Sequence, residues 1–150
     1  MNEVIKHAVA LRDGIKSLMR IMGVMEGNKA FCCDCTYTQC HALVEVGLKP
    51  GISLVELSEV INVDKSLMSR TVDDLVKKGY LKREPHAEDR RYITIQLTKS
   101  GDEVFQEIQA NSLKQFEKVI LQLPEGERQI AVQGVNAVAK AMSSMLSEKD

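Results

Sequence analysis

All four cysteines of this 150-residue chain lie within twelve consecutive positions. The stretch reads AFCCDCTYTQCH and runs from Ala30 to His41. A thiolate is both a nucleophile and a ligand for soft metal ions. Because Cys32 and Cys35 have the spacing of a chelating pair, this segment is a candidate for metal binding or for redox chemistry.

We interpret Cys32, Cys33 and Cys35 as a sensor, because they precede an expected helix whose N-terminal dipole favours a thiolate. Three thiols suit a thiophilic ion in trigonal geometry. Addition of His41, or of His7 from the N-terminal segment, would complete a tetrahedral zinc site. Reaction with peroxide or formation of a disulfide needs only two thiols. These options stay open, and no cofactor is specified beyond zinc or another thiophilic ion.

The fourth cysteine has a different expected role. Cys40 shares an apolar stripe with Leu43, Val44 and Gly47, so we interpret it as a small buried side chain, with a place in the sensor as the alternative. His41 lies beside this stripe and is interpreted as a solvated or core-edge residue, with a ligand role as its alternative.

The apolar pattern predicts a mainly α-helical chain with long helices at both ends. Residues 2–27 carry one apolar stripe, and the final helix, after Pro124, carries another. A further long helix is expected over residues 101–121. The terminal stripes are more extensive than a monomer of this length with a separate lobe could bury, so we expect a twofold homodimer.

Shorter elements are expected between the long helices. Two helices begin at capping boxes, Thr36-x-x-Gln39 and Ser53-x-x-Glu56, and a third begins after Asp64 and ends at Gly79. The segments YLKRE and RYITIQLT are expected to form a hairpin with the exposed tip PHAEDR. In its second strand Ile93, Ile95 and Leu97 alternate with Tyr92, Thr94 and Gln96. The fold class is therefore mainly α with a small β-hairpin wing.

Residues 53–78 show the helix-turn-helix pattern, whose second helix enters the major groove of DNA. One side of that helix is apolar, through Met68, Val72, Leu75 and Val76. The other side carries small hydroxyl residues and cations, and arginine can bond a guanine bidentately. The candidates for DNA contact are Lys65, Ser66, Ser69 and Arg70. An ordinary solvated helix face is the alternative for this helix taken alone.

The hairpin tip adds a second cationic feature, because Arg90 and Arg91 lie at the exposed end of a thin projection. Arginine on such a projection can enter a minor groove. The chain has a net charge of −1, yet residues 64–99 hold nine Lys and Arg against six Asp and Glu. A basic segment within an acidic frame indicates one face that meets an anion.

These motifs resemble the MarR family of winged helix-turn-helix regulators over essentially the whole chain. The resemblance rests on Thr36-x-x-Gln39-x-x-x-Leu43, SLVELSEVINVDKSLMSRTVDDLVKKGYL and the wing EDRRYITIQLTKSG. Asp89 and Arg91, followed by Leu97-Thr98-x-x-Gly101, form its most specific part. By this resemblance Asp89 orients Arg91 for the minor groove and is a further candidate for the DNA site.

The resemblance also implies an organisation and partners. Residues 1–35 and 100–150 would form long N- and C-terminal dimerisation helices, and residues 36–99 a winged helix-turn-helix lobe that binds pseudo-palindromic double-stranded DNA. A ligand or redox site would lie between the dimer base and this lobe. The crowded cysteine segment departs from many members, so an effector cannot be carried over.

We therefore expect a cytoplasmic, dimeric repressor whose operator binding changes when a soft metal or metalloid ion, or an oxidant, acts on the cysteines. The alternative is a regulator that responds to a small organic ligand, with the cysteines inert. A constitutive DNA-bending protein is a third class. A thiol oxidoreductase would need a βαβ pattern around its C-x-x-C, and none is found. No apolar run approaches the length of a membrane span, so no membrane partner is expected.

Overall fold

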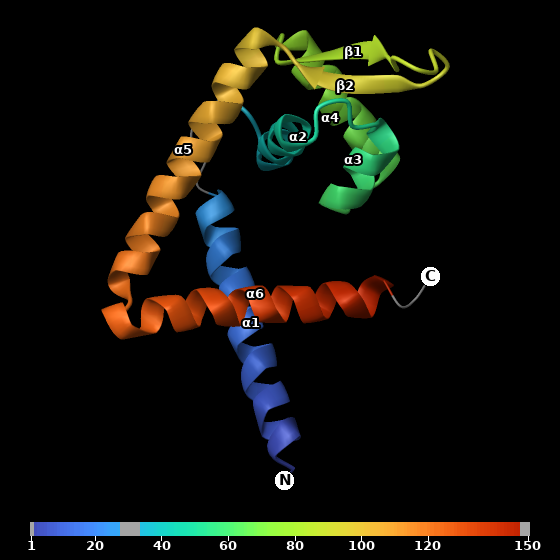
Figure 1. Cartoon of the computed structure of the whole chain (residues 1–150). Coiled ribbons are helices and arrows are strands. Elements are labelled where there is room, and N and C mark those ends of the chain that lie inside the picture. The colour runs from blue at the N-terminus through green and yellow to red at the C-terminus, as the bar shows by residue number, and fades with distance from the viewer. Residues whose placement is uncertain (1, 28–33, 148–150) are drawn as a thin grey trace. The chain divides into compact units, whose positions relative to one another are not determined.

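The structure is a computed structural model that describes residues 2–27 and 34–147. In those residues it contains six helices and two strands (Figure 1): α1 Glu3–Gly27, α2 Tyr37–Leu48, α3 Leu54–Ile61, α4 Lys65–Lys77, β1 Leu81–Pro85, β2 Ile93–Leu97, α5 Lys99–Gln122 and α6 Glu125–Ser147. The predicted fold class is confirmed. The chain divides into two compact units, Met1–Asn111 and Ser112–Asp150.

The helix starts predicted from capping residues are confirmed. The Thr36 side chain accepts a hydrogen bond from the backbone of Gln39, whose side chain accepts one from the Thr36 backbone. Ser53 and Glu56 make the same reciprocal pair at the start of α3. The Asp64 side chain accepts from the backbone of the third residue of α4 at 2.8 Å. Each capping group satisfies a backbone N–H that the helix itself leaves unpaired.

Left-handed backbone conformations end the two helices of the helix-turn-helix. Asn62, at the end of α3, has a φ of 59°, and its side chain type tolerates that region. Gly79, just after α4, has a φ of 79°, where a residue with a Cβ atom would be strained. The turn at Asn62 brings α4 against α3, and the turn at Gly79 leads directly into β1.

One hydrophobic core holds the lobe together. Figure 1 shows α2, α3 and α4 gathered beneath the hairpin, whose tip projects away from the helices. The predicted apolar side of α4 lies in this core, although Val76 is only partly buried. The largest fully buried side chains are Leu43, Val46, Ile52, Leu57, Met68, Val72, Leu75, Leu81 and Ile95.

The apolar stripe predicted for α2 is wrong by about one position. Of its members only Leu43 is fully buried, while Cys40 and Val44 pack at the edge of the core. Gly47 instead faces α5, where a Cβ atom would lie 2.6 Å from the ring of Phe105. The buried residues of α2 are Gln39, Ala42, Leu43 and Val46. The face is shifted because α2 packs against α3 and α4 and also against β2.

The hairpin is antiparallel, with Leu81 opposite Leu97 and Pro85 opposite Ile93. Relative to the predicted residues 80–84 and 91–98, β1 is shifted by one residue and β2 is shorter at both ends. Thr98 caps α5 as expected, and its hydroxyl accepts from the backbone N–H of Gly101 at 3.0 Å. The helix itself begins at residue 99, two positions before the predicted start.

The predicted alternation of β2 is only partly correct. Ile95 and Leu97 pack in or against the core, but Ile93 is 49% exposed because it pairs with Pro85 at the distal end of the hairpin. Thr94 is buried instead, and its hydroxyl donates to the carbonyl of Glu84 at 3.1 Å. A short bridge between Ile52 and Ile95 joins the hairpin to the chain before α3.

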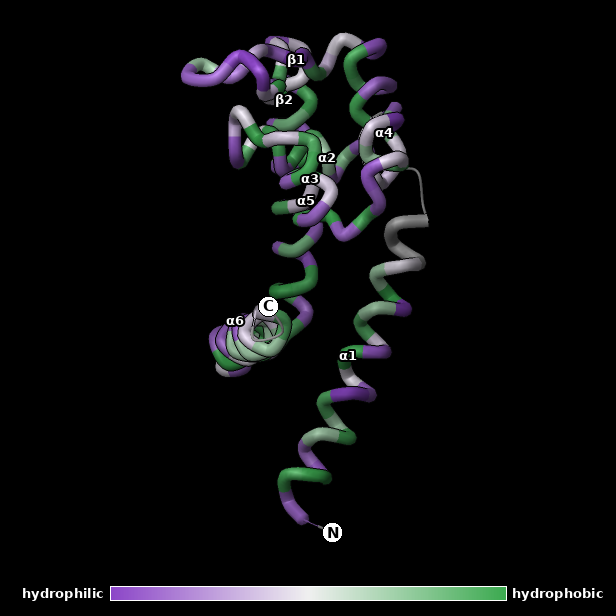
Figure 2. The backbone as a smooth tube through the Cα atoms, turned by 90° about the vertical axis from the view of Figure 1, so that its right-hand side faces the viewer, coloured by the Kyte–Doolittle hydropathy of each residue, from purple (hydrophilic) through white to green (hydrophobic). Residues whose placement is uncertain are grey.

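Large apolar side chains stay exposed along the long helices. On α1 they include Val4, Ile5, Leu11, Leu18 and Ile21, and on α6 they include Ile130, Val135, Met142, Met145 and Leu146. Figure 2 shows hydrophobic and hydrophilic positions recurring along α1. None of the helices in the described ranges combines the length and the apolar character needed to cross a membrane.

Candidate nucleic-acid interface

The first turns of α4 present the polar surface that the sequence predicts. Lys65, Ser66 and Arg70 are exposed, and Ser69 is partly buried. The opposite side of the helix is anchored by Met68, which is fully buried in the core. The structure therefore brings the four predicted contact residues of α4 to the solvent side of a helix whose orientation the core determines.

Leu67 was missed by the sequence reasoning, which assigned apolar residues to the core. It is 38% exposed and lies between Ser66 and the buried Met68 in the first turn of α4. Its position one residue before the apolar stripe was the available signal. An exposed apolar side chain at this place can contact the methyl group of a thymine.

Asp73 lies further along α4 and would repel phosphate if its charge were uncompensated. Arg83 of β1 lies within hydrogen-bonding distance, with 2.5 Å between Nη2 and the Asp73 Oδ1 atom. The pair neutralises the carboxylate and connects α4 to the first strand of the wing. Helix α4 and the wing are thus joined by an ion pair as well as by the core.

The wing tip holds a bidentate pair between Asp89 and Arg91. Arg91 Nε lies 3.0 Å from Asp89 Oδ1, and Arg91 Nη2 lies 2.8 Å from Asp89 Oδ2. The backbone N–H of Arg91 also donates to the same carboxylate, at 3.1 Å. The Arg91 side chain is 85% exposed, so its remaining N–H groups are available to an external acceptor. Arg90, its neighbour, is exposed as well.

The charge state of this pair follows from its geometry. The hydrogen bond from the Arg91 side chain, and then that from its backbone, lowers the pKa of Asp89. The same side-chain bond raises the pKa of Arg91. Both groups therefore stay ionised across the physiological pH range, and the arginine is held in one orientation.

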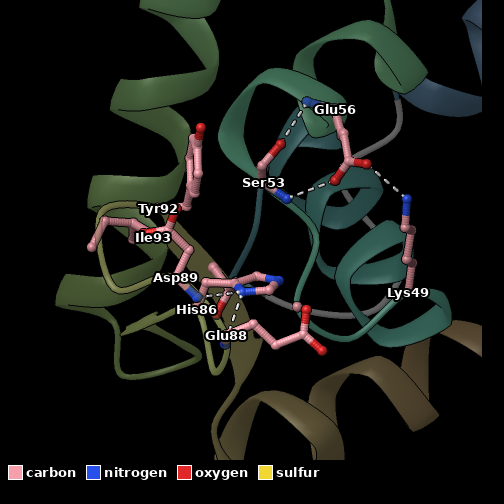
Figure 3. Close-up of a pocket in the computed structure, with 10 residues that line it drawn as sticks. Lys49, Ser53, Glu56, His86, Glu88, Asp89, Tyr92 and Ile93 are labelled. Carbon is pink, nitrogen blue, oxygen red and sulfur yellow. Dashed lines mark hydrogen bonds and ion pairs between the residues drawn. The ribbon is translucent and has the colours of Figure 1, made fainter.

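The turn before Asp89 is organised by His86, a residue that the sequence reasoning did not consider. Its Nδ1 atom accepts hydrogen bonds from the backbone N–H groups of Glu88 and Asp89, at 3.2 and 3.3 Å. The signal available in the sequence was a side-chain acceptor two and three residues before two turn residues. Figure 3 shows the His86 ring beside Asp89, in an open hollow between the wing and the chain around Ser53.

The cysteine segment is only partly within the described residues. Cys32 and Cys33 lie outside them, so the predicted sensor trio stays a prediction. Cys35 and Cys40 are partly buried against the core of the lobe. Among the side chains that the structure describes, no three His, Cys, Asp or Glu residues form a group that could hold a metal ion.

The two candidate histidine ligands, His7 and His41, are not part of a common site among the described residues. His41 packs its ring against Tyr37, with the ring centroids 4.2 Å apart and the planes inclined by 56°. His7 is exposed on α1. Their proposed roles as additional ligands stay predictions.

The three-helix lobe, the helix-turn-helix and the paired strands define a winged helix-turn-helix protein. The family model described as "MarR family" matches residues 35–93, which span α2, α3, α4 and most of the wing. Over these residues the chain is similar to the MarR family.

Curated relatives share the lobe. The chain is 29% identical over 88 residues to the HTH-type transcriptional regulator BilQ of Clostridium symbiosum, covering 59% of this chain and 61% of that protein. It is 35% identical over 68 residues to the multiple antibiotic resistance protein MarR of Escherichia coli, covering 45% and 47%. The matches thus span about half to three fifths of the length of these relatives.

Solved structures share the fold over more of the chain. The apo form of MarR from E. coli covers 70% of this chain and 78% of its own, with a TM-score of 0.62 and 26% identity. FabT of Streptococcus pneumoniae, solved in complex with DNA, covers 95% and 99%, with a TM-score of 0.71 and 20% identity. At 20% identity the likeness to FabT concerns the fold alone.

Proposed function

We propose that this protein is a transcriptional regulator that binds double-stranded DNA. In this proposal α4 enters the major groove and the wing enters an adjacent minor groove. The observation that carries it is the bidentate Asp89–Arg91 pair at the hairpin tip, in which the Arg91 side chain is 85% exposed. An arginine oriented in this way suits the negative potential of a narrow minor groove.

The face of α4 supplies the complementary reading surface. In this proposal the exposed Lys65 and Ser66 meet phosphates, and the exposed Arg70 meets a base edge. The name of the curated relative BilQ, an HTH-type transcriptional regulator, and the DNA complex of FabT support this assignment.

We further propose that the protein acts as a homodimer in the cytoplasm, and that it represses transcription. The exposed apolar side chains of α1 and α6 support a dimer, because a second copy would remove them from water. A twofold dimer presents two recognition helices about 34 Å apart, which matches one turn of DNA and a pseudo-palindromic operator.

The proposed effector is a thiophilic ion or an oxidant that acts on Cys32, Cys33 and Cys35 and lowers DNA affinity. Support comes from Asp34, which lies within this segment and contacts the end of α4. Its carboxylate lies 3.6 Å from the Lys78 ammonium and accepts a hydrogen bond from Tyr80 at 3.1 Å. In this proposal a change in the cysteine segment acts through these contacts on the residues that directly follow α4.

Selection of duplexes from a randomised pool, followed by binding titrations with the selected duplex, tests the function. We expect a pseudo-palindromic sequence and a stoichiometry of one dimer per duplex. Arg70→Ala should lose discrimination against random DNA, while Lys118→Ala, which removes an exposed charge from α5, should not. Recovery of no preferred sequence by the wild type would refute the proposal.

A further inference from the structure

The His86 side chain closes the turn that carries the proposed minor-groove arginine. Its Nδ1 atom accepts from two consecutive backbone N–H groups, those of Glu88 and Asp89. A ring nitrogen that accepts hydrogen bonds carries no proton. These two hydrogen bonds can be made only by a neutral imidazole that carries its proton on Nε2.

The backbone of His86 closes the same turn from the other side. The His86 N–H donates to the carbonyl of Tyr92 at 2.8 Å, and the Tyr92 N–H donates to the carbonyl of Asp89 at 3.1 Å. Asp89 is therefore held through its backbone N–H, by the imidazole, and through its carbonyl. Its carboxylate in turn holds Arg91. The imidazole of His86 is therefore connected to the guanidinium of Arg91 through Asp89.

We propose that neutral His86 is a positioning residue for Arg91, and that protonation of its Nδ1 atom weakens DNA binding by releasing the wing turn. The inference rests on the proposed function, because it assigns a role in DNA binding to the wing. It extends that function to a pH-dependent affinity, which none of the DNA-contacting residues would produce by itself.

The physical reason is a conflict between donors. A protonated imidazole presents N–H groups at both nitrogens, so the N–H groups of Glu88 and Asp89 would face a third donor. The imidazolium would also attract the Asp89 carboxylate and compete with Arg91 for it. Both effects act against the geometry that orients the guanidinium.

The charged groups around His86 do not remove this conflict. Glu88 and Asp89 of the turn lie beside His86, and Tyr92, just before β2, lines the same hollow with its hydroxyl directed away from the imidazole (Figure 3). Across the hollow lie Lys49 and Glu56, which pair with each other at 2.9 Å. The Ser53 backbone N–H, followed by Lys49, lowers the pKa of Glu56. Glu56, like Asp89, therefore stays ionised in the range in which histidines change charge, about pH 5 to 8.

Two substitutions of His86 distinguish the effect of losing the hydrogen-bond acceptor from the effect of protonating it. Asparagine places an amide oxygen near the position of Nδ1 and accepts without titrating, so His86→Asn should restore the turn at every pH. His86→Ala removes the acceptor. Affinity for the duplex selected by the wild type would be measured by fluorescence anisotropy at about pH 7.5 and about pH 5.5, which bracket the histidine range.

We expect the affinity of the wild type, relative to His86→Asn, to fall about tenfold between the two pH values, as the loss of two turn hydrogen bonds implies. His86→Ala should bind weakly at both. All three proteins share His7 and His41, so the difference between their profiles reports His86 alone. Parallel profiles for the wild type and His86→Asn would overturn the proposal, as would full affinity of His86→Ala.

A second readout does not depend on DNA. The amide signals of Glu88 and Asp89 in ¹H–¹⁵N spectra should follow the imidazole titration in the wild type and stay constant in His86→Asn. Amide signals that do not respond to the imidazole titration would also overturn the proposal. If the wild type selects no duplex, the proposed function fails alone, and this readout still decides whether neutral His86 holds the turn.

Discussion

Tyr80 donates a hydrogen bond from its hydroxyl to the Asp34 carboxylate at 3.1 Å, across 46 positions of the chain. Lys78 approaches the same carboxylate at 3.6 Å and also donates to the Asp34 carbonyl. The residue between Cys33 and Cys35 is thus attached to the segment that links α4 to β1.

Breaking this attachment tests whether the cysteine segment communicates with α4. We expect Asp34→Ala to lower the free energy of unfolding by less than about 1 kcal/mol, because the pair is partly exposed. It should also reduce the effect of the thiol-directed effector on DNA affinity. Urea unfolding and anisotropy titrations measure the two quantities. Asp13→Ala, which removes an exposed ion pair of α1, is the matched control and should leave the effector response intact.

Arg70→Ala should weaken specific binding by about 1–3 kcal/mol, because one bidentate base contact is lost. The fold should be unaffected, since Arg70 is exposed. Comparison of the affinities for the selected duplex and for random DNA measures the loss. An unchanged ratio would remove Arg70 from the set of base-reading residues.

Leu67→Ala should reduce discrimination at one thymine of the selected duplex and have little effect on random DNA. The reason is that an apolar side chain can read the thymine methyl group but makes no contact with phosphate. Binding to duplexes with uracil in place of each thymine identifies the base. Equal sensitivity of the wild type and Leu67→Ala to every uracil would contradict this assignment.

Two substitutions in the wing should weaken DNA binding to different degrees. Arg91→Ala should weaken binding strongly and make the dependence of log K on log salt shallower by about one unit, because a cation is lost. Asp89→Ala should act in the same direction but less, since it removes only the partner that orients Arg91. Wild-type affinity in both variants would show that the hairpin is not a DNA wing.

The Asp89–Arg91 pair also has a pH signature that differs from that of His86. The pKa of Asp89 is lowered in the folded protein, so its contribution is present above the ordinary carboxyl range and is lost only when the pH falls through the lowered value. His86→Asn should therefore show a flat affinity from neutral pH down to about pH 5, well above that range. A decline over this interval in His86→Asn would indicate that another group titrates.

Substitutions of different cysteines should affect different properties of the protein. Joint replacement of Cys32 and Cys35 by serine should preserve DNA binding and abolish the response to arsenite or peroxide, because the thiols are the reactive groups. Cys40→Ser should instead reduce stability, since it places a hydroxyl against the edge of the core. Release of DNA from the treated double variant would assign the response to another site.

The amino-acid sequence by itself determined the elements whose causes are local. The capping groups Thr36, Ser53 and Asp64 act on backbone groups within three residues, so their patterns predicted three helix starts correctly. The apolar stripe of α4 has the helical period, and it predicted which side of this helix is exposed. The Asp89–Arg91 contact was implied by the resemblance of the wing motif to the MarR family, and the structure contains it.

Tertiary structure decided the features that depend on partners distant in the chain. The buried face of α2 is set by its packing against α3, α4 and β2, and the exposure of Ile93 follows from how far the hairpin extends beyond the core. The pairing of Asp73 with Arg83 and that of Asp34 with Tyr80 needed the backbone path between them. The acceptor role of His86 depends on the folded turn. The directions of the backbone N–H groups follow from the backbone conformation, and the spacing of the residues in the sequence does not predict them.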